Sequence, residues 1–189
     1  MKALVLGAGP AGCAAALVLA RAGCGVTLVD PHVSPREKVC GDALIPDALA
    51  ALERLGLLPD VLAQARLLPG IRVFAPDRRH VDLGAQVACL ERSRLDLLLR
   101  AAALAAGATA LAPARLTRLV EQDGIVRGAV IEDLRTGVPL RLDAELTLLA
   151  TGASAAALEI AGVCRRRQPS GVALRAYFRG PRLESEVDR

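Results

Sequence analysis

Three glycines near the start of the chain have the spacing that lets a backbone turn approach a phosphate group. Gly7, Gly9 and Gly12 form a G-x-G-x-x-G pattern, and Pro10 and Ala11 stand between the second and the third. In such a pattern the first glycine makes a tight turn, the second admits a pyrophosphate, and the third lets a helix pack closely on a strand. The N–H groups at the start of that helix favour a bound anion. These residues predict a dinucleotide site.

A carboxylate follows at the position expected for binding a ribose. Asp30 lies 18 residues after Gly12, close to the offset of roughly 20 residues at which an acid binds a ribose hydroxyl. The glycine pattern alone is a weak signal in a chain rich in glycine and alanine, and the alternative is a βαβ unit whose glycines serve only packing. The order of strand, glycine turn, helix, strand and acid favours the dinucleotide site.

The polar stretch 31–42 contains further candidate groups. Cys40 stands near Lys38, and a neighbouring cation lowers the pKa of a thiol. The alternative role for Cys40 is that of a small residue filling a tight loop. Arg36 and Lys38 contact a phosphate in one interpretation and carry solvated charge in the other. Because long ordered loops in compact domains are often functional, the stretch is predicted to belong to the site.

The elements that position these groups are predicted to form an α/β fold with a parallel sheet. Residues 3–6 and 26–30 are apolar runs typical of buried strands, and the residues from about 11 to 22 between them predict a helix. Other predictions for this layer are an amphipathic helix within 43–58 that begins near Pro46, a short helix or turn over 59–70, a helix over 93–106 with Ser93 as its N-cap, and strands over 109–112 and 145–150.

A second, antiparallel layer is predicted between the parallel strands. Alternating apolar and polar residues at 71–74 and 80–83 indicate a hairpin. Asp123-Gly124 is a strong hairpin signal between two further strands. The strands predicted for this layer are 71–74, 80–83, a returning strand at 87–90, 115–120, 125–132, 140–143 and 170–178.

Composition excludes several classes of protein. The 189 residues include two Phe, one Tyr and no Trp, so a net charge of +4 and one basic cluster, Arg165 to Arg167, do not predict nucleic-acid binding. The five cysteines show no C-x-x-C spacing, so no disulfide framework and no metal site are predicted. We find neither an uninterrupted apolar span nor a signal peptide, and expect a cytoplasmic protein, with peripheral membrane contact as an open alternative.

Four stretches in this order resemble the FAD-dependent oxidoreductases of the geranylgeranyl reductase and aromatic hydroxylase (flavin monooxygenase) superfamily. They are the glycine turn at 7–12, the Lys38-Val-Cys-Gly-Asp42 loop, Arg92 before a helix, and the Ala150-Thr-Gly-Ala-Ser154 turn. The K-x-C-G loop and residues 171–179 are most similar to the geranylgeranyl reductase branch.

The resemblance implies a role for each candidate residue. Gly7, Gly9, Pro10, Ala11 and Gly12 would hold the FAD pyrophosphate, Asp30 the adenosine ribose, and Arg92, Thr151 and Gly152 would face the cofactor. On the residues alone, pairing with Glu91 or Asp96 is the alternative role for Arg92. Thr151 stands where the superfamily commonly carries aspartate, so one hydrogen bond is kept and the charge is lost. Cys40 would lie near the flavin ring and only assist, because the flavin carries the hydride.

The implied architecture is a Rossmann-like FAD-binding domain interleaved with an antiparallel β substrate layer. Its predicted parts are residues 1–70, 87–112 and 144–162 for the FAD-binding domain, 71–86 and 163–189 for a partial substrate domain, and 113–143 for a β-hairpin or meander insertion. Superfamily members are longer and carry a second Gly-Asp motif that we do not find after residue 42. We therefore expect a chain truncated at its C-terminus.

The implied activity is transfer of hydride from reduced FAD to a carbon–carbon double bond of a small apolar substrate, with NAD(P)H as a candidate electron donor. Three alternatives stay open at this point. They are a flavin monooxygenase on the same scaffold, a non-catalytic nucleotide-binding fragment that needs a partner, and a Rossmann protein that binds only NAD.

Overall fold

A parallel sheet of four strands carries the amino-terminal pattern in the computed structural model, which describes residues 1–33, 38–164 and 171–177. The strand order is β10-β1-β2-β6, with β1 at Lys2–Leu6, β2 at Gly25–Val29, β6 at Thr109–Leu111 and β10 at Leu146–Leu149. Ala3, Leu4, Val5 and Leu6 are all buried. Burial on both faces explains why this strand is a continuous apolar run rather than an alternating one.

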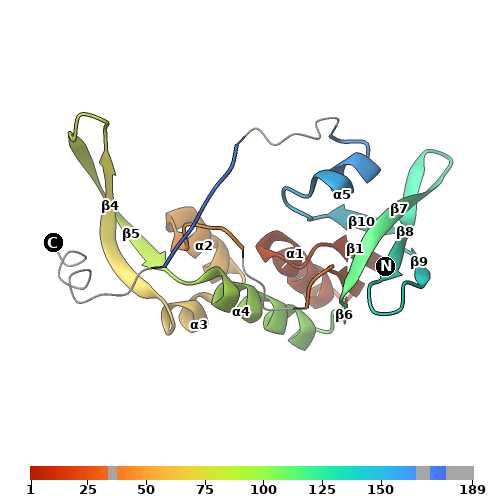
Figure 1. Ribbon diagram of the computed structural model, residues 1–189. Helices are drawn as coiled ribbons and strands as arrows, with labels where there is room; N and C mark the ends of the chain where they lie inside the picture. The colour runs from red at the N-terminus through yellow and green to blue at the C-terminus, as the bar shows by residue number, and fades with distance from the viewer. Residues whose placement is uncertain (34–37, 165–170, 178–189) are drawn as a thin grey trace.

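The two faces of this sheet pack against different layers (Figure 1). Ala3 and Val5 belong to a core shared with the helices α1 and α4, whereas Leu4 and Leu6 belong to a core shared with a three-stranded antiparallel sheet. Successive side chains of a strand point to opposite faces, so this division follows directly from the period of two. The helices are α1 (Pro10–Arg21), α2 (Pro46–Arg54), α3 (Leu58–Leu62), α4 (Arg92–Ala105) and α5 (Ala155–Ile160).

The antiparallel sheet under the second face has the order β7-β8-β9. Its strands are β7 (Ala114–Gln122), β8 (Ile125–Asp133) and β9 (Pro139–Asp143). Asp123 and Gly124 join the first two with φ angles of 50° and 73°. Positive φ at both central residues is the type I′ geometry that suits a two-residue hairpin, and the predicted hairpin is confirmed.

The other antiparallel strands form a second three-stranded sheet, and two of them extend away from the parallel sheet as a hairpin (Figure 1). They are β3 (Ala43–Leu44), β4 (Arg66–Phe74) and β5 (His80–Cys89), in the order β3-β5-β4. The short helix predicted over 59–70 is present as α3 but ends at Leu62. The part of the prediction that reaches residue 70 is wrong, because β4 begins at Arg66. The separate strand predicted at 87–90 is the end of β5. The sequence pattern breaks at Pro69, where the structure has a register shift between Leu68 and Gly70 and the pairing continues.

Two further local predictions are corrected. Helix α4 begins at Arg92 and not after Ser93; its N-cap is Glu91, which makes no side-chain capping bond. Residues 171–177, the described part of the strand predicted over 170–178, form no strand. Within the described part of the chain, no helix has the length and apolar character needed to cross a bilayer. Arg36 and the Arg165 to Arg167 cluster lie outside the described residues.

Candidate functional site

The glycine turn connects β1 with α1, and two of its glycines are required by packing. Gly7 has a φ of +109°, and a Cβ at this position would lie 2.4 Å from the carbonyl oxygen of Ala150. At Gly12 a Cβ would lie 1.7 Å from the carbonyl oxygen of Gly7. At Gly9, by contrast, a Cβ would meet nothing within 4 Å. The middle glycine therefore borders open space, as expected where a ligand approaches the backbone.

Asp30 lies beside this turn, immediately after β2. Its carboxylate accepts the Ala8 N–H at 2.7 Å and the His32 N–H at 2.8 Å, and only 4% of the residue is exposed. The side chain thus points toward the turn and not away from it. Its contact with a ribose stays a prediction, and its observed role is to connect the glycine turn with the backbone that follows β2.

A pocket of about 390 Å³ opens where β1 and β10 end and α1 and α4 begin. Its lining includes residues from all four stretches that carry the resemblance. They are Gly9, Pro10, Ala11, Lys38, Arg92, Leu149, Ala150, Thr151 and Gly152. Ligands of open α/β sheets bind outside the carboxyl ends of the strands, and this pocket has that position.

Thr151 contributes a polar atom that fits a ligand. Its hydroxyl is buried and has no hydrogen-bond partner in the described part of the chain; Thr147, earlier on β10 and outside this pocket, has the same property. Buried polar groups are nearly always hydrogen-bonded, so the Thr151 hydroxyl has unused capacity at the pocket. Helix geometry also leaves the first N–H groups of α1 without intrahelical partners. An open glycine, unpaired donors and an orphaned hydroxyl together fit the phosphate portion of FAD.

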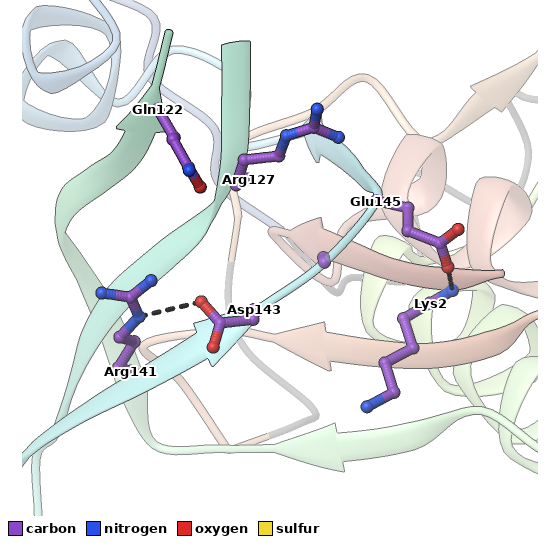
Figure 2. Close-up of a pocket in the computed structure, with 7 residues that line it drawn as sticks. Lys2, Gln122, Arg127, Arg141, Asp143 and Glu145 are labelled. Atoms are coloured by element: carbon purple, nitrogen blue, oxygen red, sulfur yellow. Dashed lines mark hydrogen bonds and ion pairs between the residues drawn. The ribbon is translucent and has the colours of Figure 1, made fainter.

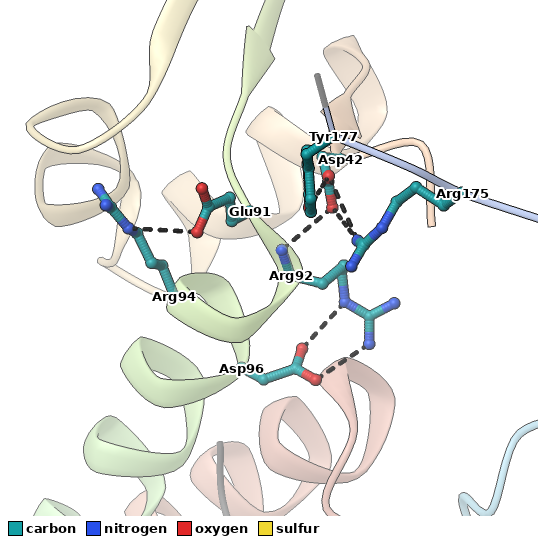
Figure 3. Close-up of polar contacts among 7 residues, drawn as sticks. All are labelled: Asp42, Glu91, Arg92, Arg94, Asp96, Arg175 and Tyr177. Atoms are coloured by element: carbon teal, nitrogen blue, oxygen red, sulfur yellow. Dashed lines mark hydrogen bonds and ion pairs between the residues drawn. The ribbon is translucent and has the colours of Figure 1, made fainter. Parts of the chain in front are cut away.

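Arg92 pairs with Asp96, the alternative role considered for it, and it also lines the pocket. Its guanidinium binds the Asp96 carboxylate through two bonds of 3.0 and 3.1 Å, and its side chain is 13% exposed (Figure 3). Glu91 instead pairs with Arg94 at 3.7 Å. Burial lowers the pKa of Arg92, but hydrogen bonds to Asp96 and Cys40 outweigh this effect and raise it. The charge is therefore held at the edge of the pocket, and its contact with the cofactor stays a prediction.

The cation that helps lower the pKa of the Cys40 thiol is Arg92 and not Lys38, the neighbour predicted from the sequence. Partial burial raises the pKa of Cys40, but a hydrogen bond from the Asp42 backbone and the hydrogen bond and charge of Arg92 lower it below its ordinary value. Cys40 does not line the pocket itself. Its role in catalysis stays a prediction.

Three residues that had no role predicted from the sequence meet next to Cys40 and Arg92. They are Asp42, Arg175 and Tyr177. The Asp42 carboxylate accepts hydrogen bonds from Tyr177 at 2.6 Å and from Arg175 at 3.1 Å (Figure 3). The bond to Asp42 raises the pKa of Tyr177 to about 12. The available signal was the R-x-Y spacing, which places both side chains on one side of an extended segment.

A second pocket, of about 320 Å³, lies at the opposite end of the sheet (Figure 2). It is lined by Lys2, Gln122, Arg127, Arg141, Asp143, Ala144 and Glu145. Lys2 and Glu145 mark the amino ends of β1 and β10, and Arg141 is paired with Asp143 at 2.8 Å. Because cofactors of such sheets bind at the carboxyl ends, we do not assign this pocket to the dinucleotide.

The family model described as FAD binding domain matches residues 1–177. The chain therefore belongs to this family of FAD-binding domains, and the predicted FAD cofactor and α/β fold class are confirmed. This agrees with the fit of the pocket to a dinucleotide.

Two curated reductases and one solved flavoprotein are among the proteins to which the chain is similar. The chain is 34% identical over 187 residues to menaquinone reductase of Mycolicibacterium smegmatis, covering 95% of this chain and 44% of the relative. It is 33% identical over 155 residues to geranylgeranyl diphosphate reductase of Rhodobacter capsulatus, covering 80% and 37%. A solved flavoprotein/dehydrogenase from Cytophaga hutchinsonii superposes with a TM-score of 0.75 at 25% identity, over 92% of this chain and 44% of that one. The chain thus spans less than half the length of these proteins.

Proposed function

We propose that this chain forms the FAD-binding part of an oxidoreductase that passes hydride from reduced FAD to a carbon–carbon double bond of an apolar substrate. The observation that carries the proposal is the pocket at the carboxyl ends of β1 and β10, which gathers Gly9, Lys38, Arg92 and Thr151. When bound, FAD supplies the hydride chemistry.

The residues of this chain bind and orient the cofactor. The turn at Gly9 and the first N–H groups of α1 favour the pyrophosphate, because amide donors and the positive end of the helix dipole both stabilise an anion. Lys38 and Arg92 add positive charge to the same pocket. The Thr151 hydroxyl supplies a hydrogen bond without a charge.

The substrate is proposed from the relatives and from composition. Two relatives are named for menaquinone and for geranylgeranyl diphosphate, and both compounds contain a polyprenyl group. The aliphatic composition of this protein suits such a substrate. NAD(P)H as electron donor, contact of Asp30 with the ribose, a cytoplasmic location and contact with a membrane surface are further parts of the proposal.

The first test is cofactor binding by the 189-residue chain. We expect added FAD to remain with the protein after gel filtration, with the yellow absorption of a bound flavin and altered fluorescence, and NAD not to displace it. Absence of bound flavin at micromolar protein would contradict the proposal and favour a fragment that needs a partner. Displacement of FAD by NAD would favour an NAD-binding Rossmann protein.

The second test addresses the reaction. We expect the FAD-loaded protein to saturate the double bonds of a polyprenyl substrate under anaerobic conditions, once its flavin has been reduced chemically. A requirement for oxygen together with a hydroxylated product would contradict the reductase proposal and identify a flavin monooxygenase.

A further inference from the structure

The Asp42 carboxylate connects three segments that are far apart in the sequence (Figure 3). It belongs to the 38–42 loop and accepts the backbone N–H of Arg92, the first residue of α4, at 3.1 Å. It also accepts the Tyr177 hydroxyl at 2.6 Å and the Arg175 guanidinium at 3.1 Å. Only 7% of Asp42 is exposed. Hydrogen bonds to an ionised group are stronger than neutral ones, especially where water is excluded.

The backbone of Asp42 is engaged as well. Its carbonyl oxygen accepts the Leu90 N–H at 2.9 Å, and its backbone helps lower the pKa of the Cys40 thiol. Its φ is +58°, a conformation that aspartate and asparagine tolerate better than most residues. Substitution by asparagine therefore removes the charge while keeping a residue suited to this backbone.

Residues 171–177 meet the loop through Arg175 and Tyr177. The guanidinium carbon of Arg175 lies 4.5 Å from the centre of the Tyr177 ring, and the Arg175 side chain is 16% exposed. Val172 and Leu174, which alternate with them, are 86% and 93% exposed. Because this segment belongs to no sheet, the contacts with Asp42 are well placed to fix its position.

We propose that Asp42 is a positioning residue of the FAD site, whose carboxylate holds the 38–42 loop, the start of α4 and residues 171–177 as one unit. This unit keeps Lys38 and Arg92 at the pocket and Cys40 against Arg92. The proposal rests on the proposed function, because it assigns these groups to cofactor binding.

The Cys40 thiol reports on this arrangement without any cofactor. We would alkylate the full chain with iodoacetamide between about pH 6 and pH 10 and quantify the Cys40 peptide by mass spectrometry. In Asp42→Asn, loss of the nearby negative charge alone would lower the pKa of Cys40, whereas separation of Cys40 from Arg92 would raise it. The proposal requires the second effect to dominate. We expect at least about a threefold lower alkylation rate at neutral pH, which corresponds to about half a pKa unit.

The matched control is Asp82→Asn. Asp82 also binds an arginine through two bonds, to Arg72 at 2.6 and 2.9 Å, but on the exposed hairpin away from the pocket. We expect the Cys40 profile and the amide exchange of residues 171–177 to match the unmodified chain in this control. In Asp42→Asn we expect faster exchange over residues 171–177. A Cys40 profile that is unchanged or shifted to lower pH in folded Asp42→Asn would overturn the proposal.

A second variant decides the question if Asp42→Asn does not fold. Arg175→Gln combined with Tyr177→Phe removes the contacts of residues 171–177 and leaves the carboxylate in place. The same upward shift of the Cys40 profile supports the proposal, and an unchanged profile overturns it.

FAD titration separates this proposal from the proposed function. If the unmodified chain binds FAD, we expect Asp42→Asn to weaken binding about tenfold, and unchanged affinity would overturn the role at the FAD site. If the unmodified chain binds no FAD, the proposed function fails, and the Cys40 profile alone decides whether Asp42 positions these groups.

Discussion

A methyl group added at Gly12 should lower the stability of the fold, whereas one added at Gly9 should weaken FAD binding, although the two glycines belong to the same turn. At Gly12 the new Cβ would lie 1.7 Å from the Gly7 carbonyl oxygen, 2.9 Å from its carbonyl carbon and 3.3 Å from the Ala150 Cβ. Two of these are backbone atoms, so the helix must move away from the strand. At Gly9 the new Cβ would meet nothing within 4 Å, and its φ of −77° suits any residue.

The magnitudes follow from these contacts. Overpacking costs about 1–3 kcal/mol, occasionally more, and replacing a helical glycine by alanine otherwise gains about 0.5–1 kcal/mol. We expect Gly12→Ala to lower the free energy of unfolding by about 2 kcal/mol or more, which lowers the Tm by about 4–8 °C for a chain of this size. Gly9→Ala should change stability by less than about 1 kcal/mol. It should weaken FAD binding at least about tenfold, or about 1.4 kcal/mol, because the methyl group would occupy the space proposed for the pyrophosphate.

Thermal melts without cofactor and fluorescence titrations with FAD measure the two effects separately. Gly25→Ala is the matched control, since Gly25 begins the neighbouring strand at the other end of the sheet and its added Cβ would also meet nothing within 4 Å. We expect this control to keep both properties. If Gly9→Ala binds FAD as tightly as the unmodified chain, the glycine turn is not the phosphate site. If Gly12→Ala has the same Tm as the unmodified chain, the close contact between α1 and β1 has been misjudged.

Three further predictions use other parts of the molecule. Thr151→Val should leave the Tm unchanged or higher and weaken FAD binding by about 0.5–1.5 kcal/mol in titrations, because it removes an orphaned hydroxyl; tighter binding would contradict the role of Thr151. Cys40 should be alkylated at lower pH than Cys13 in a pH series read by mass spectrometry, because Arg92 helps lower the first pKa and burial raises the second to about 11; the reverse order would refute the described surroundings of both thiols. Gly128→Ala should lower the Tm measurably, because its φ is +139° and the new Cβ would lie 2.0 Å from the Leu142 carbonyl oxygen; an unchanged Tm would contradict the close pairing of β8 with β9.

The parts of the fold that could be predicted have local causes. Continuous apolar runs predicted β1 and β2, because a strand covered on both faces has no polar side. Asp123 and Gly124 predicted their hairpin, because few residue pairs adopt two positive φ angles. The start of β4 was missed for a related reason. Pro69 and Gly70 are local turn signals, but the pairing across the register shift, Leu68 with Val87 and Gly70 with Gly84, is a long-range contact.

The start of helix α4 also depends on a long-range contact that local sequence signals do not reveal. Ser93 is a good N-cap by type, and nothing nearby in the sequence indicates a better partner for the first turn. The structure places the N-cap two residues earlier, at Glu91, where the Asp42 carboxylate, 50 residues away, accepts the Arg92 N–H. A capping group from another segment cannot be recognised from the residues that surround the helix.

One end of the candidate site follows from local sequence signals, and the other end depends on long-range contacts. The end proposed to bind phosphate is built from the ends of β1 and β10 and the start of α1, where steric requirements select glycine and leave a recognisable pattern. Its other end depends on Asp42, Arg175 and Tyr177, whose contacts join residues 133 and 135 positions apart. Charged and hydroxyl side chains satisfy such contacts in many local conformations, so no periodicity or turn preference marks them. The sequence therefore predicts where a dinucleotide phosphate binds, whereas the arrangement of Cys40, Arg92 and the 38–42 loop becomes visible only in the folded chain.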